Sequence, residues 1–324
     1  MITTVDYHTG GEPFRIVTGG VPEIAGSGVL DRRTTAMAEF DDVRRLLCNE
    51  PRGHADMYGC FLVPPDDSGA RLGALFWHKD GFSTACGHGT IALGAYAVHE
   101  GLVEAPADGV TDVVVDVPSG RVTARVRTAA GRVDAVTFVN VPSFVLARGV
   151  PAGDVLVDLA YGGAVYASLP AAGLGLTVEP RHLGALIEHA RRIKAALAGH
   201  PATRHPSDER LSGVYGVIFH EDLPDLPDLD GVRHQRNVTV FADGEVDRSP
   251  CGSGTAARMA LLHDADGTAT LVHESVVGSV FTARVGATSS DGVVAEIDGT
   301  AYRTGRHTFE LDPADPFPTG FTLR

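Results

Sequence analysis

Two short stretches of this sequence, Cys86-Gly87-His88-Gly89-Thr90 and Cys251-Gly252-Ser253-Gly254-Thr255, repeat one pattern in the two halves of the chain. Each copy begins with a cysteine and is followed by a run of small and apolar residues, 91–95 in the first copy and 256–261 in the second. Such a run after a glycine-rich turn predicts the opening of a buried helix, so each thiol is expected at a helix N-terminus. The repeat favours two related lobes.

Composition and charge narrow the class of protein. The 324 residues include 27 Lys plus Arg and 41 Asp plus Glu, a net charge of −14. This excess of acidic residues argues against a nucleic acid or an anionic membrane as the main partner. The N-terminus lacks the basic and apolar parts of a signal peptide, and no stretch approaches the about 20 apolar residues of a membrane span. We expect a cytoplasmic protein.

The four cysteines fall into two groups. They are too few for a disulfide framework in a chain of this length, and a reducing compartment leaves Cys86 and Cys251 free to act as thiol and thiolate. Cys60 lies in an apolar, strand-like run, and Cys48 follows two leucines. For these two we predict simple packing in the core.

Strand patterns separated by Gly and Pro breaks run through both halves of the chain. They cover residues 14–17, 58–63, 75–77, 113–115, 122–126, 136–138, 155–159 and 237–241. Helical periodicity covers residues 183–197 and predicts a structural amphipathic helix. The acidic, proline-broken segment 221–228 is expected to be a surface loop. The pattern indicates an α/β (α+β) protein with a boundary near residues 141–150.

The two cysteine motifs favour acid–base chemistry on an anionic substrate. Glycines at their second and fourth positions bring backbone N–H groups close to a ligand, and the helix dipole adds partial positive charge. The same field lowers a cysteine pKa from about 8.5 toward roughly 3.5 to 7.5. If one cysteine is a thiolate and the other a thiol, the first removes an α-proton and the second protonates the opposite face. This inversion requires no cofactor.

Other interpretations of the motifs are weaker. A single Cys-Gly-x-Gly turn fits a plain helix entry with a buried thiol, but here it occurs twice. Zinc is disfavoured because Cys86 and His88 are only two residues apart and no Cys-x-x-Cys pair occurs. Neither copy has the Lys or the glycine spacing of a nucleotide loop. We therefore expect no metal and no cofactor. Asp247, shortly before Cys251, either caps the turn or contacts a substrate ammonium group.

Further motifs run over nearly the whole chain, and with them it resembles the proline racemase superfamily. That superfamily includes hydroxyproline 2-epimerases and trans-3-hydroxyproline dehydratases. The motifs are Gly10-Gly11-Glu12-Pro13, Glu50-Pro51-Arg52-Gly53-His54, Cys86-Gly87-His88-Gly89, Tyr161-Gly162-Gly163, Asp247-Arg248-Ser249-Pro250-Cys251-Gly252 and Thr304-Gly305-Arg306-His307-Thr308-Phe309.

The resemblance implies a diaminopimelate-epimerase-like fold. Two similar lobes, residues 1–143 plus 306–324 and residues 144–305, would each wrap a β-barrel-like sheet around a central helix, with the active site in the cleft. By this resemblance Cys86 and Cys251 are the two bases. The same family pattern has the backbone of Gly87, His88, Gly252 and Ser253 hold the substrate carboxylate, while His88 and Asp247 contact the ring nitrogen.

The resemblance leaves the reaction within the family open. In the dehydratases a threonine typically replaces the second cysteine, so Cys251 favours inversion. The stretches 52–59 and 81–84 look more like the dehydratase branch, and Ala164 replaces an Asn that often follows Gly-Gly in racemases. His54 would contact a ring hydroxyl or serve in a turn.

The sequence as a whole predicts a cofactor-independent isomerase of amino-acid metabolism, a racemase or 2-epimerase of proline or a hydroxyproline with two catalytic thiols. The alternative is a trans-3-hydroxy-L-proline dehydratase, which would release Δ1-pyrroline-2-carboxylate. A non-catalytic imino-acid-binding protein is the third interpretation. In each case the partner is a small molecule, and a homodimeric assembly is left open.

Overall fold

The computed structural model describes residues 1–227 and 231–323. The chain divides into two compact units, Met1–Val136 with Thr300–Arg324, and Thr137–Gly299. The sequence placed the second division after residue 305, which lies inside the last strand. No helix in the described part of the chain combines the length and the apolar character that crossing a membrane requires.

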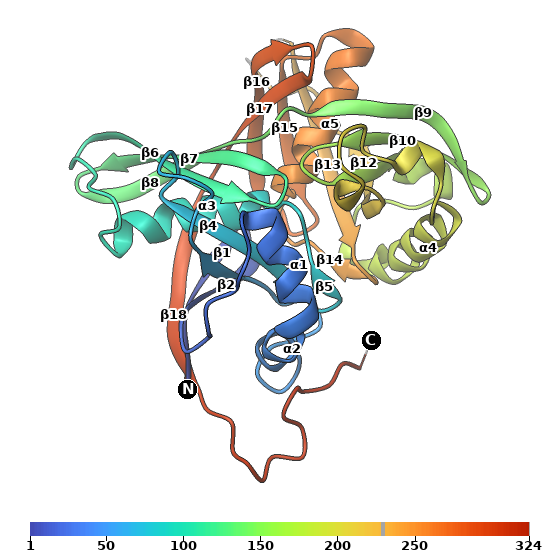
Figure 1. Cartoon of the computed structure of the whole chain (residues 1–324). Helices are drawn as coiled ribbons and strands as arrows, with labels where there is room; N and C mark the ends of the chain where they lie inside the picture. The colour runs from blue at the N-terminus through green and yellow to red at the C-terminus, as the bar shows by residue number, and fades with distance from the viewer. Residues whose placement is uncertain (228–230, 324) are drawn as a thin grey trace. The chain divides into compact units, whose positions relative to one another are not determined.

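In its described residues, 1–136 and 300–323, the first unit has three helices, and all its strands but the last come before residue 130 (Figure 1). Its helices are α1 (Val29–Glu39), α2 (Asp41–Cys48) and α3 (Gly87–His99). Its strands are β1 (Ile2–Thr9), β2 (Glu12–Gly19), β3 (Tyr58–Val63), β4 (Leu72–His78), β5 (Gly81–Phe82), β6 (Gly109–Val117), β7 (Gly120–Ala129) and β18 (Ala301–Phe309). Strand β8 (Arg132–Val139) crosses from the first unit into the second.

Strand pairing in the first unit mixes parallel and antiparallel neighbours. The order is β18, β1, β2, β3, β4, β6 and β7. The β2–β3 and β4–β6 pairs are parallel, and the other pairs are antiparallel. The short strand β5 pairs with the end of β4 and leads into α3.

Among the described residues of the second unit, 137–227 and 231–299, are the other two α-helices and four short 3₁₀ helices. Its helices are α4 (Leu183–Ala196), α5 (Gly252–Asp266), η1 (Ala171–Leu174), η2 (Pro180–His182), η3 (Pro201–Thr203) and η4 (Glu209–Leu211). Its strands are β9 (Phe144–Ala152), β10 (Val155–Tyr161), β11 (Val165–Pro170), β12 (Val214–Asp222), β13 (Val232–Phe241), β14 (Glu245–Val246), β15 (Thr270–Ser275), β16 (Val280–Ser289) and β17 (Gly292–Gly299).

The second unit repeats the strand pairing of the first. Its order is β9, β10, β11, β12, β13, β15 and β16. The β11–β12 and β13–β15 pairs are parallel, like β2–β3 and β4–β6 in the first unit, and the other pairs are antiparallel. The short strand β14 pairs with the end of β13 and precedes α5, as β5 precedes α3. The two cysteine motifs therefore occupy equivalent places in two copies of one topology, as the repeat in the sequence predicts.

Each unit is built around its cysteine-capped helix. Every residue of α3 from Gly87 to Ala97 is buried, and so is every residue of α5 from Gly252 to Leu262. A helix that is apolar on all sides needs partners on all sides, which the surrounding strands supply. Gly94 allows one close approach, because a Cβ at this position would lie 2.6 Å from the Cβ of Ala124. The sheets thus fix where each helix begins, and with it each thiol.

The strands expected from the sequence lie within observed strands, the expected helix ends one residue beyond the observed one, and one loop is corrected. The expected amphipathic helix is α4, whose Leu186, Ala190 and Ile193 are buried. The loop expected over residues 221–228 is shorter at its start, because β12 continues through Asp222. There the strand is held by pairing with β13. Asp228, at the end of that loop, lies outside the described residues.

Candidate active site

The first cysteine motif places the thiol of Cys86 over the first turn of α3. Cys86 is the N-cap residue, with an extended backbone, and its Sγ accepts a hydrogen bond from the N–H of Gly89 at 3.2 Å. A Cβ on Gly89 would lie 2.7 Å from Sγ, so glycine is what allows the sulfur so close to the backbone. Cys86 is 4% exposed. The backbone N–H and the helix dipole both favour negative charge on this sulfur.

His88 is the side chain that faces this sulfur. Both its Nδ1 and its Nε2 lie 3.5 Å from Sγ of Cys86. Edge-on contacts with the rings of Phe14 and Tyr58 hold the imidazole in place, and Thr9 donates a hydrogen bond to its backbone carbonyl at 3.0 Å. Imidazole and thiol side chains this close can exchange a proton.

The second cysteine motif has a different backbone. Cys251 lies in the left-handed region with φ 64°, an unusual conformation for a residue with a side chain. The turn before it is held by Asp247, whose carboxylate accepts hydrogen bonds from the N–H of Ser249 at 2.8 Å and from its hydroxyl at 2.7 Å. The Ser249 hydroxyl in turn accepts from the N–H of Cys251 at 3.1 Å. Residues held in such conformations cluster at functional sites.

The surroundings of Cys251 favour its thiol over the thiolate. Burial raises its pKa well above the usual value, and the neighbouring Asp247 carboxylate raises it further, against a hydrogen bond from the N–H of Gly254. Burial also raises the pKa of Asp247 to about 6, although hydrogen bonds from Ser249 and Cys251 oppose this shift. The two groups share a hydrogen bond. Cys251 is thus suited to donate a proton.

The helix start of α5 is anchored by three further polar contacts. The hydroxyl of Ser253 lies 2.6 Å from the hydroxyl of Tyr166 in β11. The hydroxyl of Thr255 donates to the carbonyl of Pro250 at 3.0 Å and lies 2.8 Å from Nδ1 of His273. The first N–H groups of both α3 and α5 have no acceptor within their own helices, so each helix start can bind a carboxylate.

The structure groups the predicted residues by unit. Cys86, Gly87 and His88 lie together at the start of α3 in the first unit. The second unit brings together Asp247, Cys251, Gly252 and Ser253 at the start of α5. Asp247 caps the turn, which was one of the two roles open to it.

His54, Cys48 and Cys60 have contacts typical of a turn or of core packing. His54 is exposed, and its Nδ1 accepts from the N–H of Asp56 at 3.3 Å, which is the turn role. Cys48 and Cys60 are fully buried in the first unit, as predicted for packing. Burial alone raises the pKa of Cys60. Cys48 donates to the carbonyl of Met57 at 3.3 Å.

Some polar residues of the candidate site are not evident from the sequence. Tyr166 and Ser249 contact the second motif, and Tyr58, hydrogen-bonded to Ser83, contacts His88 in the first. Only Ser249 carries a local signal, because an Asp two residues before a Ser is typical of a side-chain-capped turn. The others come from strands distant in sequence.

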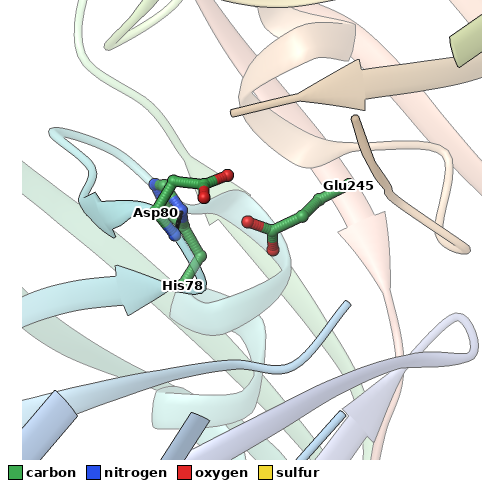
Figure 2. Close-up of side chains that lie close together, drawn as sticks. All are labelled: His78, Asp80 and Glu245. Atoms are coloured by element: carbon green, nitrogen blue, oxygen red, sulfur yellow. Dashed lines mark hydrogen bonds between the residues drawn. The ribbon is translucent and has the colours of Figure 1, made fainter. Parts of the chain in front are cut away.

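Ionisable side chains also lie near the short strands β5 and β14. In the first unit the N–H of Asp80 donates to Nδ1 of His78 at 3.2 Å, at the end of β4 (Figure 2). In the second unit Glu245, also labelled in Figure 2, is fully buried in β14 opposite Phe241. Within either unit taken by itself, residues 1–227 and 231–323 hold no group of three His, Cys, Asp or Glu side chains close enough to share one metal ion.

Known proteins resemble this chain over its whole length. The proline racemase family model matches residues 4–322. Trans-3-hydroxy-L-proline dehydratase of Bacillus thuringiensis is 41% identical over 332 residues, which cover 99% of this chain and 98% of the relative. 3-Hydroxyproline 2-epimerase of Burkholderia multivorans is 40% identical over 335 residues, covering 100% and 98%. The crystal structure of a hydroxyproline epimerase from Agrobacterium vitis, with bound trans-4-hydroxy-L-proline, matches with a TM-score of 0.90 at 30% identity, covering 99% and 95%.

Proposed function

This chain belongs to the proline racemase family, and from that premise we propose that it dehydrates trans-3-hydroxy-L-proline to Δ1-pyrroline-2-carboxylate. The names of the dehydratase and the epimerase relatives share 3-hydroxyproline as the substrate. They differ in reaction class, since a dehydratase is a lyase and an epimerase is an isomerase. Dehydration becomes the leading proposal because the dehydratase name recurs among relatives about 41% identical to this chain.

The observation that carries the proposal is the burial of Cys251 beside the Asp247 carboxylate. Burial and the Asp247 carboxylate favour the thiol over the thiolate. A buried acid of this kind can protonate a leaving hydroxyl group, which departs poorly as hydroxide. The role of acid in dehydration therefore matches the chemistry of the residue.

In the proposed mechanism Cys86 is the base. Its Sγ, which accepts the N–H of Gly89 at the start of α3, would remove the α-proton of the substrate. Backbone N–H groups of Gly87, His88, Gly252 and Ser253 are proposed to bind the carboxylate and to stabilise the charge that develops beside it. His88 would receive the proton from Cys86 at a distance of 3.5 Å.

Loss of water then balances the reaction. The electron pair of the broken α-C–H bond forms the C2–C3 double bond, and the C3–O bond breaks. Cys251 transfers its proton to the departing hydroxyl group, which leaves as water. The resulting enamine tautomerises to Δ1-pyrroline-2-carboxylate. A proton from solvent, passed on by Asp247, which shares a hydrogen bond with Cys251, would restore the thiol before the next turnover.

Epimerisation at the α-carbon is the second candidate, and the presence of a second thiol favours it. If the intermediate keeps its hydroxyl group, Cys251 can protonate the α-carbon from the face opposite Cys86. Both reactions begin with the same proton removal. They differ in which atom receives the proton of Cys251.

Proton NMR in D2O separates these reactions. The protein is incubated in separate tubes with trans-3-hydroxy-L-proline, trans-4-hydroxy-L-proline and L-proline. Loss of the 3-hydroxyproline signals with growth of a pyrroline product is the expected result. Deuterium at the α-position of an accumulating opposite epimer would assign the isomerase reaction instead, and the tube in which it occurs identifies the ring.

Substitution of each thiol tests the residue assignment and separates an enzyme from a binding protein. Cys86→Ser and Cys251→Ser should each abolish turnover, whereas Cys48→Ser, which keeps a donor for the carbonyl of Met57, should retain it. Calorimetric titration with L-proline measures the binding affinity of the same three variants. A protein that binds imino acids without turning them over would keep its affinity in all three variants and produce no pyrroline in any of them.

A further inference from the structure

A pair of buried hydroxyl groups lies beside the second thiol. Tyr166 is 1% exposed and lies in β11 directly opposite Gly216 of β12, which leaves room for its ring. The ring also packs edge-on against Tyr215, with 5.8 Å between centroids. This packing fixes the phenol oxygen 2.6 Å from the hydroxyl of Ser253, the second residue of α5.

The same phenol oxygen lies 3.9 Å from Sγ of Cys251 and is a second acceptor for the thiol proton, beside the Asp247 carboxylate. Tyr166 thus connects Cys251, the acid of the proposed reaction, to the hydroxyl group of Ser253. The backbone of Ser253 is proposed to bind substrate. If the phenol of Tyr166 donates to the hydroxyl oxygen of Ser253, the hydroxyl proton of Ser253 remains available for a hydrogen bond to substrate. The described residues offer that hydroxyl no hydrogen-bond partner besides Tyr166.

We propose that Tyr166 is a positioning residue for the second half-reaction, holding the proton on Cys251 and turning the hydroxyl proton of Ser253 toward the 3-hydroxyl group of the bound substrate. The hydrogen bonds run in the order Cys251 to Tyr166 to Ser253 to substrate, and the proton that Cys251 gives to the departing hydroxyl group is passed along them. This inference rests on the proposed function for its substrate, but its contacts lie entirely within the second unit. It predicts that Tyr166 favours loss of the hydroxyl group over protonation of carbon.

The charges near the thiol set the expected direction of the effect. Asp247 is the carboxylate that faces Cys251, and Arg248 lowers the pKa of Asp247. A hydrogen bond donated by S–H stabilises the thiol relative to the thiolate. Tyr166→Phe removes the acceptor, leaves both charges in place and keeps the packing of the ring. The pKa of Cys251 should therefore fall.

The first experiment reads this pKa without turnover. In a Cys86→Ala background, the rate of iodoacetamide alkylation at Cys251 is followed by mass spectrometry against pH, with and without Tyr166→Phe. The matched control is Tyr161→Phe, because the described residues give the buried hydroxyl of Tyr161 no hydrogen-bond partner. The midpoint should move to lower pH with Tyr166→Phe and stay in place with Tyr161→Phe. An unchanged or higher midpoint for Tyr166→Phe overturns the proposal.

The second experiment measures turnover of trans-3-hydroxy-L-proline by Tyr166→Phe, Ser253→Ala and the double variant. Each single change should lower kcat by about 10-fold, with KM changed less than about threefold, because one hydrogen bond to the departing group is lost. If the two residues act as one chain, the double variant loses no more than either single variant. Losses that multiply would reject the connection.

The fate of the intermediate gives a further readout. In D2O, Tyr166→Phe should raise the share of substrate recovered as the deuterated opposite epimer relative to pyrroline, and Tyr161→Phe should not. The same share in wild type and Tyr166→Phe contradicts the inference. Failure of the wild-type protein to act on any hydroxyproline would instead reject the proposed function, while the alkylation experiment would still decide the role of Tyr166.

Discussion

The carboxylate of Asp247 accepts two hydrogen bonds from Ser249, one from the backbone N–H at 2.8 Å and one from the hydroxyl at 2.7 Å. It also shares a hydrogen bond with the thiol of Cys251 and is only 3% exposed. Burial nevertheless outweighs these bonds and raises the pKa of Asp247 to about 6. Desolvation of a carboxylate costs more than a few hydrogen bonds return.

Asp247 should therefore make the protein less stable as the pH rises. The folded protein holds this proton more tightly than the unfolded chain, so its contribution to the free energy of unfolding is complete below about pH 4 and is lost by about pH 6. A shift from 3.8 to about 6 corresponds to about 3 kcal/mol. Urea unfolding should show that Asp247→Asn removes most of this loss. The exposed-tail variant Asp312→Asn is the control, and an equal pH slope in both variants would contradict the prediction.

Gly89 should tolerate no side chain, because its backbone N–H contacts the thiol of Cys86. A Cβ there would approach Sγ of Cys86 to 2.7 Å and would collide with the ring of Phe14. Gly89→Ala should lower kcat by more than about 100-fold, since displacement of a reacting group by about 1 Å has effects of this size. Gly184→Ala, in an exposed turn of α4 with open space around it, should leave activity unchanged. Steady-state kinetics on both variants checks this, and an active Gly89→Ala would show that the sulfur need not contact the backbone.

The repeat and the fold were predictable from the sequence because they depend on local patterns. Glycine at the second and fourth motif positions, apolar helix openings and strand periodicity all act over a few residues, and the two-lobed α/β fold they indicate is confirmed by the match to solved family members. Tyr166 was not predictable in this way. Its contact with Cys251 joins residues 85 apart and depends on how β11 pairs with β12. In our proposal the choice between dehydration and inversion depends on this contact.

The C-terminal tail should be held to the first unit by the family motif that contains Arg52. The guanidinium of Arg52 pairs with Asp315 and donates to the carbonyl of Phe317 at 3.2 Å, while residues Glu50 and Phe321 exchange backbone hydrogen bonds. Asp315→Asn weakens the ion pair, and about 1 kcal/mol of local stability should be lost, because the pair is partly buried. Limited proteolysis should then cut the tail faster than in wild type. Asp312→Asn serves as the neighbouring control, and equal cleavage rates would show that the backbone bonds suffice.

His220 should make the second unit sensitive to acid, with a sign opposite to that of Asp247. This imidazole lies in β12, its Nδ1 is buried without a hydrogen-bond partner among the described residues, and burial together with Arg258 lowers its pKa to about 3. The unfolded chain takes up the proton below about pH 6.5 and the folded protein does not, so stability is complete above that pH and is lost as the pH falls.

Between about pH 6.5 and pH 5 this single group should lower the free energy of unfolding by about 2 kcal/mol, because each pH unit below 6.5 contributes about 1.4 kcal/mol. His220→Gln carries no titratable proton and should remove that loss, whatever its effect on stability at neutral pH. His189→Gln, on the partly exposed face of α4, is the matched control. Urea unfolding at the two pH values gives the slope for each variant. If His220→Gln loses as much stability as wild type, the acid sensitivity arises from other groups, with the fully buried His273, whose pKa burial also lowers, as the next to substitute.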